Sequence, residues 1–225
     1  MCHNQHMIQK TKLTYVTDTY CIWCWGFGEA LRGFADANAD QIELEVLPGG
    51  LLVGERVQAV GQKEGVLESA QRMTEMTGVA TGEGFRDAVQ EGSTVLDSGV
   101  AARAFWALHS LAPEHGLDIA HALQHAWYED GQDLHDTAVI SQVARDLGLD
   151  PEAAAQAYAA PESEAQAQAG FERRKELDVP GYPSLLVYGP NGPQRIGGAK
   201  ATPEKLTAAF QKIRSGEALP TDDAE

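Results

Sequence analysis

Two of the chain's three cysteines lie three positions apart in the segment TYCIWCWGFGEALRGF, residues 19–34. This spacing brings the thiols of Cys21 and Cys24 within reach of each other. Such a pair can exchange disulfides, supply half of a metal site, or lie buried without any chemistry. The elements on either side of the pair bear on which of these holds.

The segment before the pair predicts a strand, and the segment after it predicts a helix. LTYVTD, residues 13–18, alternates and is rich in β-branched and aromatic residues. From Cys24 to about Asn38, apolar side chains recur at helical intervals. QIELEVLPGG, residues 41–50, predicts a second strand, so the chain begins as a β-α-β unit with parallel strands and a right-handed crossover.

The middle of the chain predicts helices only. Residues 55–178 are dominated by Ala, Gln, Glu and Leu, and glycines and prolines divide them into several segments. The clearest helix covers residues 98–112, and residues 136–158 contain two more, the second with Asp150 as N-cap and Pro151 at its first position. We therefore expect an all-helical insertion.

Strand signals return near the C-terminus. PSLLVYG, residues 183–189, and RIGGA, residues 195–199, flank a turn and predict a hairpin. TPEKLTAAFQKIRSG, residues 202–216, predicts a closing helix with Thr202 as N-cap. The predicted order is thus strand, Cys-x-x-Cys, helix, strand, helical insertion, hairpin and helix.

A cysteine at the start of a helix meets unpaired backbone N–H groups and the positive end of the helix dipole, which stabilise a thiolate. We therefore expect a lowered pKa for Cys21 and assign it as the nucleophile. Cys24, one turn further on, is placed to attack a mixed disulfide formed on Cys21 and release the substrate.

These elements and motifs resemble the DsbA-like thioredoxin superfamily of thiol-disulfide oxidoreductases, close to its cytoplasmic branch. The resemblance covers roughly residues 12–215 and rests on DTYCIWCWGF, on the helical insertion and on VPGYPSLLV. It implies an α/β, thioredoxin-like fold with β-α-β and β-β-α halves. The discontinuous domain would comprise residues 12–54 and 179–216, the all-helical insertion 55–178, and flexible termini 1–11 and 217–225.

The resemblance also implies the substrate-binding residues. In this family a loop with a cis-proline lies opposite the cysteines, and GYPS matches it at Pro183. The backbone of Tyr182 would pair with substrate as a short antiparallel strand. Tyr182 is larger than the Thr or Val that the family commonly has there, which leaves the substrate class open. Trp23 and Trp25 are expected to form an apolar rim that grips partly unfolded peptides.

The implied function is thiol-disulfide exchange or isomerisation with protein or peptide thiols and disulfides. No cofactor is expected beyond the redox-active cysteine pair, with glutathione as an optional co-substrate and glutathione or a reductase as redox partner. The dipeptide Ile22-Trp23 cannot place a positive charge beside the thiolate as a His would. We therefore expect a less oxidising couple than that of a Cys-Pro-His-Cys enzyme.

Two other functions remain open. One is a glutathione-dependent isomerase or transferase of the kappa-class or chromene-carboxylate isomerase type. Those proteins usually have Ser where Cys21 stands and lack a resolving cysteine, so Cys24 argues against that function. The other is a peptide-binding chaperone module without turnover.

The remaining composition excludes several classes. A formal charge of -16 and the absence of a dense Lys/Arg segment argue against nucleic acid as partner. No long apolar run predicts a membrane span, and the N-terminus lacks an apolar leader, so we expect a cytoplasmic protein. No metal is expected, because Cys2, His3 and His6 lack a second Cys-x-x-Cys pair. His121 and His125 share a helix face without the Glu of a zinc-protease motif.

Overall fold

The computed structural model describes residues 10–198, 200–217 and 219. Cys2, His3 and His6, and most of the two predicted flexible termini, lie outside these residues. Four strands form a mixed sheet in the order β2-β1-β5-β6. The strands are β1 Thr11–Thr17, β2 Ile42–Pro48, β5 Ser184–Gly189 and β6 Gly192–Ile196. β1 pairs with β2 in parallel, as predicted, and β5 is antiparallel to both β1 and β6.

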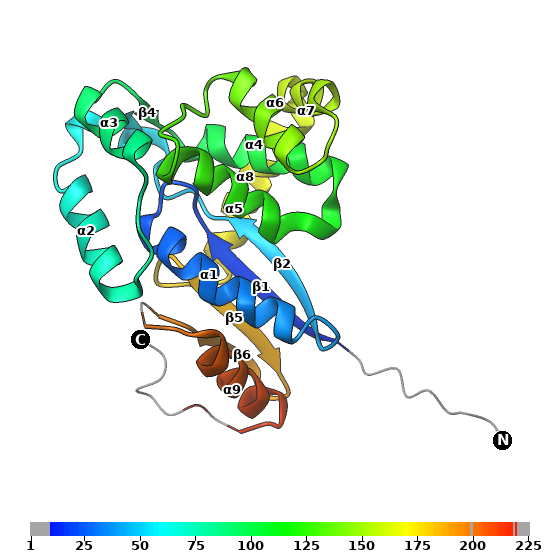
Figure 1. The fold of residues 1–225 in the computed structure, drawn as a ribbon. Coiled ribbons are helices and arrows are strands. Elements are labelled where there is room, and N and C mark those ends of the chain that lie inside the picture. The colour runs from blue at the N-terminus through cyan, green and yellow to red at the C-terminus, as the bar shows by residue number, and fades with distance from the viewer. Residues whose placement is uncertain (1–9, 199, 218, 220–225) are drawn as a thin grey trace.

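Helices cover both faces of this sheet (Figure 1). Helices α1, Ile22–Ala37, and α9, Pro203–Arg214, lie side by side on one face, where the rings of Phe34 and Phe210 meet edge to face at 5.7 Å. Helix α8, Pro161–Glu176, lies behind the sheet and contacts β2. Alternating residues of β1 supply the two sides: Leu13 and Tyr15 belong to the main core, and Val16 belongs to a smaller cluster on the opposite face.

The insertion is helical, as predicted, with one addition. Its α-helices in the described chain, besides α8, are α2 Val66–Thr77, α3 Glu83–Glu91, α4 Ser98–Leu111, α5 Gly116–Tyr128, α6 Thr137–Asp146 and α7 Pro151–Ala159, and short 3-10 helices lie at Gly54–Arg56, Val60–Gln62 and Pro113–His115. Two short strands, β3 Gln58–Ala59 and β4 Val95–Leu96, pair in an antiparallel ladder that the sequence analysis did not predict. Two-residue strands are too short to show an alternating pattern, so the expectation of an all-helical insertion was wrong at this point.

Local side chains begin these helices as expected. The carboxylate of Asp150 accepts hydrogen bonds from the backbone N–H groups of Glu152 and Ala153, and the Thr202 hydroxyl accepts one from Lys205. Both predicted N-caps are therefore confirmed. Helix α1 differs in its start: it begins at Ile22 and not at Cys24, which makes Cys21 its N-cap residue.

The hairpin is confirmed, but its second strand is shifted. β6 covers Gly192–Ile196, whereas residues 195–199 were expected. Gly197 and Gly198 have φ angles of 107° and 144°, which lie outside the range of a strand and favour glycine. The strand therefore ends where the glycines begin.

One main hydrophobic core joins the sheet and the insertion. It contains Leu13 and Phe34 from the β-α-β unit together with Leu108, Leu123 and Trp127 from the insertion. The division into a discontinuous domain and an insertion stays a prediction. Among the described residues, no helix combines the length and apolar character that crossing a bilayer requires.

We expect Phe210→Ala to lower the free energy of unfolding by about 3–5 kcal/mol, because it leaves a cavity against Phe34 in the core between α1 and α9. Urea denaturation followed by circular dichroism measures the change. Lys212→Ala, on the exposed side of the same helix, is the matched control and should shift the midpoint little. A loss below about 1 kcal/mol for Phe210→Ala would show that this contact does not hold α9 in place.

Candidate active site

The two cysteines lie at the first turn of α1, where β1 delivers the chain to the edge of the sheet. Both thiols are free. The sulfur of Cys21 accepts a hydrogen bond from the backbone N–H of Cys24 at 3.3 Å, and the Cys21 carbonyl begins the helix by accepting from Cys24 at 2.9 Å. The Cys21 sulfur thus occupies the N-cap position that a Ser or Asp oxygen usually fills.

The pair is more deeply buried than a helix-start cysteine need be. Cys21 is 4% exposed and Cys24 is fully buried. Burial raises the pKa of the Cys21 thiol well above its ordinary value, and the neighbouring Cys24 side chain adds to this; the Cys24 N–H opposes it. The expected lowering of the Cys21 pKa is therefore wrong for this closed site, because desolvation outweighs the helix start.

A tyrosine that the sequence analysis did not single out lies behind Cys24. Tyr15, in the middle of β1, is buried and its hydroxyl accepts a hydrogen bond from Thr17 at 3.2 Å. Burial raises the pKa of the Tyr15 hydroxyl, and Cys24 raises it further both by its charge and through a hydrogen-bonding contact. Since Thr17 supplies a donor, the Tyr15 hydroxyl is free to donate toward Cys24. Tyr15 stands in the strand six residues before Cys21, a position whose alternation signalled only a core residue.

Asp18 anchors the turn that leads into Cys21. Its carboxylate, 3% exposed, accepts from the backbone N–H groups of Tyr20 at 3.0 Å and Leu51 at 2.7 Å, and from the Ser98 hydroxyl at 3.0 Å. Its carbonyl accepts from the Cys21 N–H at 3.2 Å. Burial raises the pKa of Asp18, and these hydrogen bonds oppose the rise.

The GYPS loop has the predicted backbone: the Tyr182–Pro183 peptide bond is cis. The Tyr182 hydroxyl donates to the Gly49 carbonyl at 2.5 Å, so its ring packs across the end of β2. Burial raises the pKa of Tyr182 to about 12, and the charges of Asp18 and Cys24 contribute to this rise. The loop and the cysteine turn therefore lie close enough to interact electrostatically.

The two tryptophans take different places. Trp23 is half-buried at the edge of the core. Trp25 is only 7% exposed, donates its indole N–H to the Ala80 carbonyl at 2.9 Å, and stacks on His121 and Tyr128 at 5.3 and 5.9 Å. The prediction that Trp25 belongs to an apolar rim was wrong, because its ring is used to pack α1 against α5.

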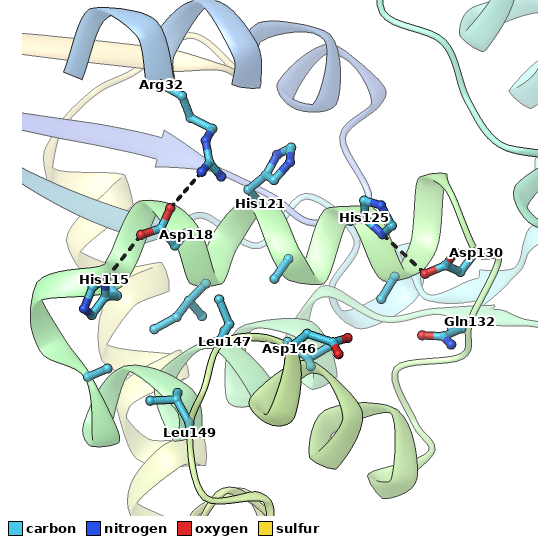
Figure 2. Close-up of a pocket in the computed structure, with 15 residues that line it drawn as sticks. Arg32, His115, Asp118, His121, His125, Asp130, Gln132, Asp146, Leu147 and Leu149 are labelled. Carbon is cyan, nitrogen blue, oxygen red and sulfur yellow. Dashed lines mark hydrogen bonds and ion pairs between the residues drawn. The ribbon is translucent and has the colours of Figure 1, made fainter. Parts of the chain in front are cut away.

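The histidines of α5 border a separate cavity of about 600 Å³ (Figure 2). His125 is exposed and pairs with Asp130 at 3.3 Å, and Arg32 of α1 reaches Asp118 at 3.1 Å. Burial lowers the pKa of His121 to about 4, which keeps the ring neutral against Trp25. This cavity contains none of the predicted site residues.

The described residues offer no group of three or more His, Cys, Asp or Glu side chains arranged to hold a metal ion. The metal site considered for Cys2, His3 and His6 lies outside those residues. What the described site contains is two adjacent thiols, a buried phenol and a loop with a cis-proline. These groups suit disulfide exchange.

The sheet order, the cysteine turn and the cis-proline loop together define a thioredoxin-like protein. The chain belongs to the family of DSBA-like thioredoxin domains, whose model matches residues 12–211. No curated protein sequence matches it.

Solved structures with the same fold include a cytosolic disulfide reductase, DsbM from Pseudomonas aeruginosa. It is 22% identical with a TM-score of 0.77, and the match covers 89% of this chain and 97% of that one. The structure of the same protein with GSH is 21% identical with a TM-score of 0.74, and the match covers 89% of this chain and 98% of that one. A disulfide isomerase candidate from Nitrosomonas europaea is 23% identical with a TM-score of 0.76, and the match covers 91% of this chain and 99% of that one.

We expect the alkylation rate of Cys21 in the reduced protein to keep rising with pH between about pH 7 and about pH 9, because the thiolate is the reactive form and burial raises the pKa. Iodoacetamide labelling quantified on the Cys21 peptide measures this. N-acetylcysteine is the reference, and the Cys21 profile should lie at higher pH. A plateau below about pH 7 would contradict it.

We expect Tyr15→Phe to slow the attack of Cys24 on a Cys21 mixed disulfide by about 3- to 10-fold, because the hydrogen-bonding contact to Cys24 is lost. The release of the second thionitrobenzoate after reaction with Ellman's reagent follows this step separately from the first. Tyr188→Phe removes a hydroxyl from the same sheet, near Thr14, and should leave both phases unchanged. Equal slowing of both phases would point to a structural effect.

Proposed function

We propose that this protein catalyses thiol-disulfide exchange with protein or peptide substrates through Cys21 and Cys24. The observation that carries the proposal is the placement of Cys21 as the N-cap of α1 with Cys24 one turn behind it. Membership of the DSBA-like family and the cis peptide at Pro183 support it.

The reaction follows from the two thiols. The Cys21 thiolate attacks one sulfur of a substrate disulfide, forms a mixed disulfide and expels the other substrate sulfur as a thiolate. Cys24, after losing its proton, attacks the Cys21 sulfur and releases the second substrate thiol. Two electrons pass to the substrate, and the protein is left with a Cys21–Cys24 disulfide that glutathione or a reductase must reduce.

The substrate chain would lie along the GYPS loop. Pro183 turns the backbone before β5, and the Tyr182 backbone is proposed to pair with an extended substrate segment next to Cys21. Trp23, half-buried beside the cysteines, would supply an apolar contact. Because the Tyr182 hydroxyl is bonded to the Gly49 carbonyl, this side chain does not point freely toward a substrate.

The electrostatics of the pair favour the reducing direction. An oxidising couple arises when the reduced form is stabilised as a thiolate, and here burial destabilises the Cys21 thiolate. The dipeptide Ile22-Trp23 supplies no charge to offset this. We therefore propose a disulfide reductase working in the cytoplasm, in keeping with the cytosolic reductase that shares its fold. A reduction potential below about −220 mV, measured against glutathione, fits this direction, and one above about −180 mV contradicts it.

We expect Cys21→Ser to lower insulin disulfide reduction at least about 100-fold, because the attacking thiol is lost and Cys24, which is fully buried, is not exposed to the substrate. Cys24→Ser should instead accumulate a mixed disulfide on Cys21, visible by mass spectrometry. Cys2→Ser is the control for loss of a thiol and should keep full activity.

The same set of variants separates the other functions. Full glutathione-dependent activity in Cys24→Ser would favour a glutathione-dependent isomerase or transferase, since that chemistry needs no resolving cysteine. Suppression of substrate aggregation by Cys21→Ser, with no exchange activity in the native protein, would favour a peptide-binding chaperone module. The position of Cys24 one turn behind Cys21, with its N–H bonded to the Cys21 sulfur, supports exchange over the glutathione-dependent enzyme, which needs no resolving cysteine.

A further inference from the structure

A second cavity, of about 740 Å³, lies beside the GYPS loop and contains none of the cysteines. Tyr182 forms one wall, and the Gly49-Gly50 turn after β2 forms the next. A Cβ at Gly49 would lie 2.1 Å from the Tyr182 ring, and one at Gly50 would lie 2.9 Å from Phe171 of α8. The turn is therefore closely packed against both rings, which fixes this cavity beside the proline loop. We call it the α8 cavity.

We propose that the α8 cavity recognises a carboxylate carried by the disulfide substrate, through the guanidinium groups of Arg56 and Arg174. This rests on the proposed exchange at Cys21 and names the class of substrate that it favours. The carboxylate belongs either to a small acidic thiol compound or to an acidic residue near the disulfide of a peptide or protein.

The two arginines lack carboxylate partners within the described part of this strongly acidic chain. Among the described residues, the Arg56 guanidinium has one hydrogen bond, to the Gly50 carbonyl at a long 3.4 Å. Arg174 donates to the Val179 carbonyl at 3.2 Å and lies over the Tyr182 ring at 5.3 Å, and its buried Nε has no partner. Each guanidinium carries five N–H donors, so both keep donors for an anion.

The carboxylates of the α8 cavity are already engaged or distant. Asp97 caps α4 by accepting from the Gly99 N–H at 2.7 Å, and Glu172 pairs with Lys175 at 2.7 Å. Glu164 accepts from Gln168 near the start of α8, ten residues before Arg174, or about 15 Å along the helix axis. Of the three cations that line the cavity, Lys175 is paired with Glu172, so Arg56 and Arg174 are the two that have no carboxylate partner among the described residues.

The position of the arginines suits a substrate bound at the cysteines. The charges of Arg174 and Arg56 both lower the pKa of the Tyr182 hydroxyl, against the larger effect of burial, so both act on the residue that precedes Pro183. A disulfide compound whose sulfur meets Cys21 along this loop would place groups a few bonds away toward the α8 cavity. Arginine recognises a carboxylate at such a site by paired hydrogen bonds.

The test compares disulfides that differ in charge. The fully reduced protein is mixed with glutathione disulfide or with neutral 2-hydroxyethyl disulfide, and Cys21–Cys24 oxidation is followed by acid quench and thiol alkylation. After correction for the rates of both disulfides with dithiothreitol, we expect the native protein to prefer glutathione disulfide by about tenfold. That preference should fall with added salt.

Variants assign the preference to the arginines. We expect the double variant Arg56→Gln/Arg174→Gln to bring the ratio of the two rates close to one, and Arg174→Lys to keep part of it. Arg145→Gln, an exposed arginine on α6 that lies outside the α8 cavity, removes one positive charge and should leave the ratio unchanged. A native preference that survives in the double variant, or no native preference, overturns the proposal.

A peptide arm and a binding arm complete the design. Two cyclic peptides, each with one disulfide, differ only in having Glu or Gln beside a cysteine. A faster reaction of the Glu peptide shows that the protein also prefers acidic peptides. If the protein prefers glutathione disulfide but treats the two peptides alike, the site is assigned to small acidic thiol compounds. S-methylglutathione, which cannot exchange, is titrated calorimetrically into the native protein and the double variant. If neither disulfide oxidises the protein, the proposed function fails. In that case weaker binding of S-methylglutathione to the double variant than to the native protein still supports the arginine site. Equal binding to both proteins overturns the arginine site.

Discussion

The cysteine site depends on one buried carboxylate. Asp18 receives hydrogen bonds from its own turn, from the loop after β2 and from the first turn of α4, and its carbonyl receives the N–H of Cys21. Removing a charge from water is unfavourable unless its oxygens are well paired, and here they are. The arrangement of the first strand, the second strand and the insertion around the cysteines thus follows from satisfying this one group.

Burial governs the chemistry as well as the fold. The helix start and the Cys24 N–H would favour a Cys21 thiolate, whereas removal from water disfavours it, and in this closed arrangement the removal has the larger effect. Cys24 is buried next to Tyr15. The neutral Tyr15 hydroxyl can donate a hydrogen bond to the Cys24 sulfur without adding a charge to the site. The raised pKa of Cys21 thus favours its protonated thiol in this arrangement.

Much of this architecture could be predicted from the sequence because its signals are local. Alternation identified β1 and β2, and the caps at Asp150 and Thr202 placed two helix starts correctly. The β-α-β order, the hairpin and the GYPS loop indicated the family, and the family implied the cis bond at Pro183. The two thiols were identified by spacing alone.

The parts that escaped prediction depend on contacts between distant segments. Trp25 was predicted to form an apolar rim with Trp23, yet its partners, Ala80, His121 and Tyr128, come from the insertion. The pKa of Cys21 depends on how much water the fold excludes, and no local pattern contains that information. Tyr15 has the pattern of any core residue, and its position beside Cys24 appears only when β1 and α1 are placed together.

The bond between Gln124 and the Asp18 carbonyl, together with the edge contact of Tyr20 and Trp127, makes α5 the rear support of the cysteine turn. The helices of the insertion therefore cannot be replaced without affecting the cysteine turn. A minimal version of this protein, reduced to its sheet with α1 and α9, would retain both cysteines in sequence but lose the support that fixes the turn between them.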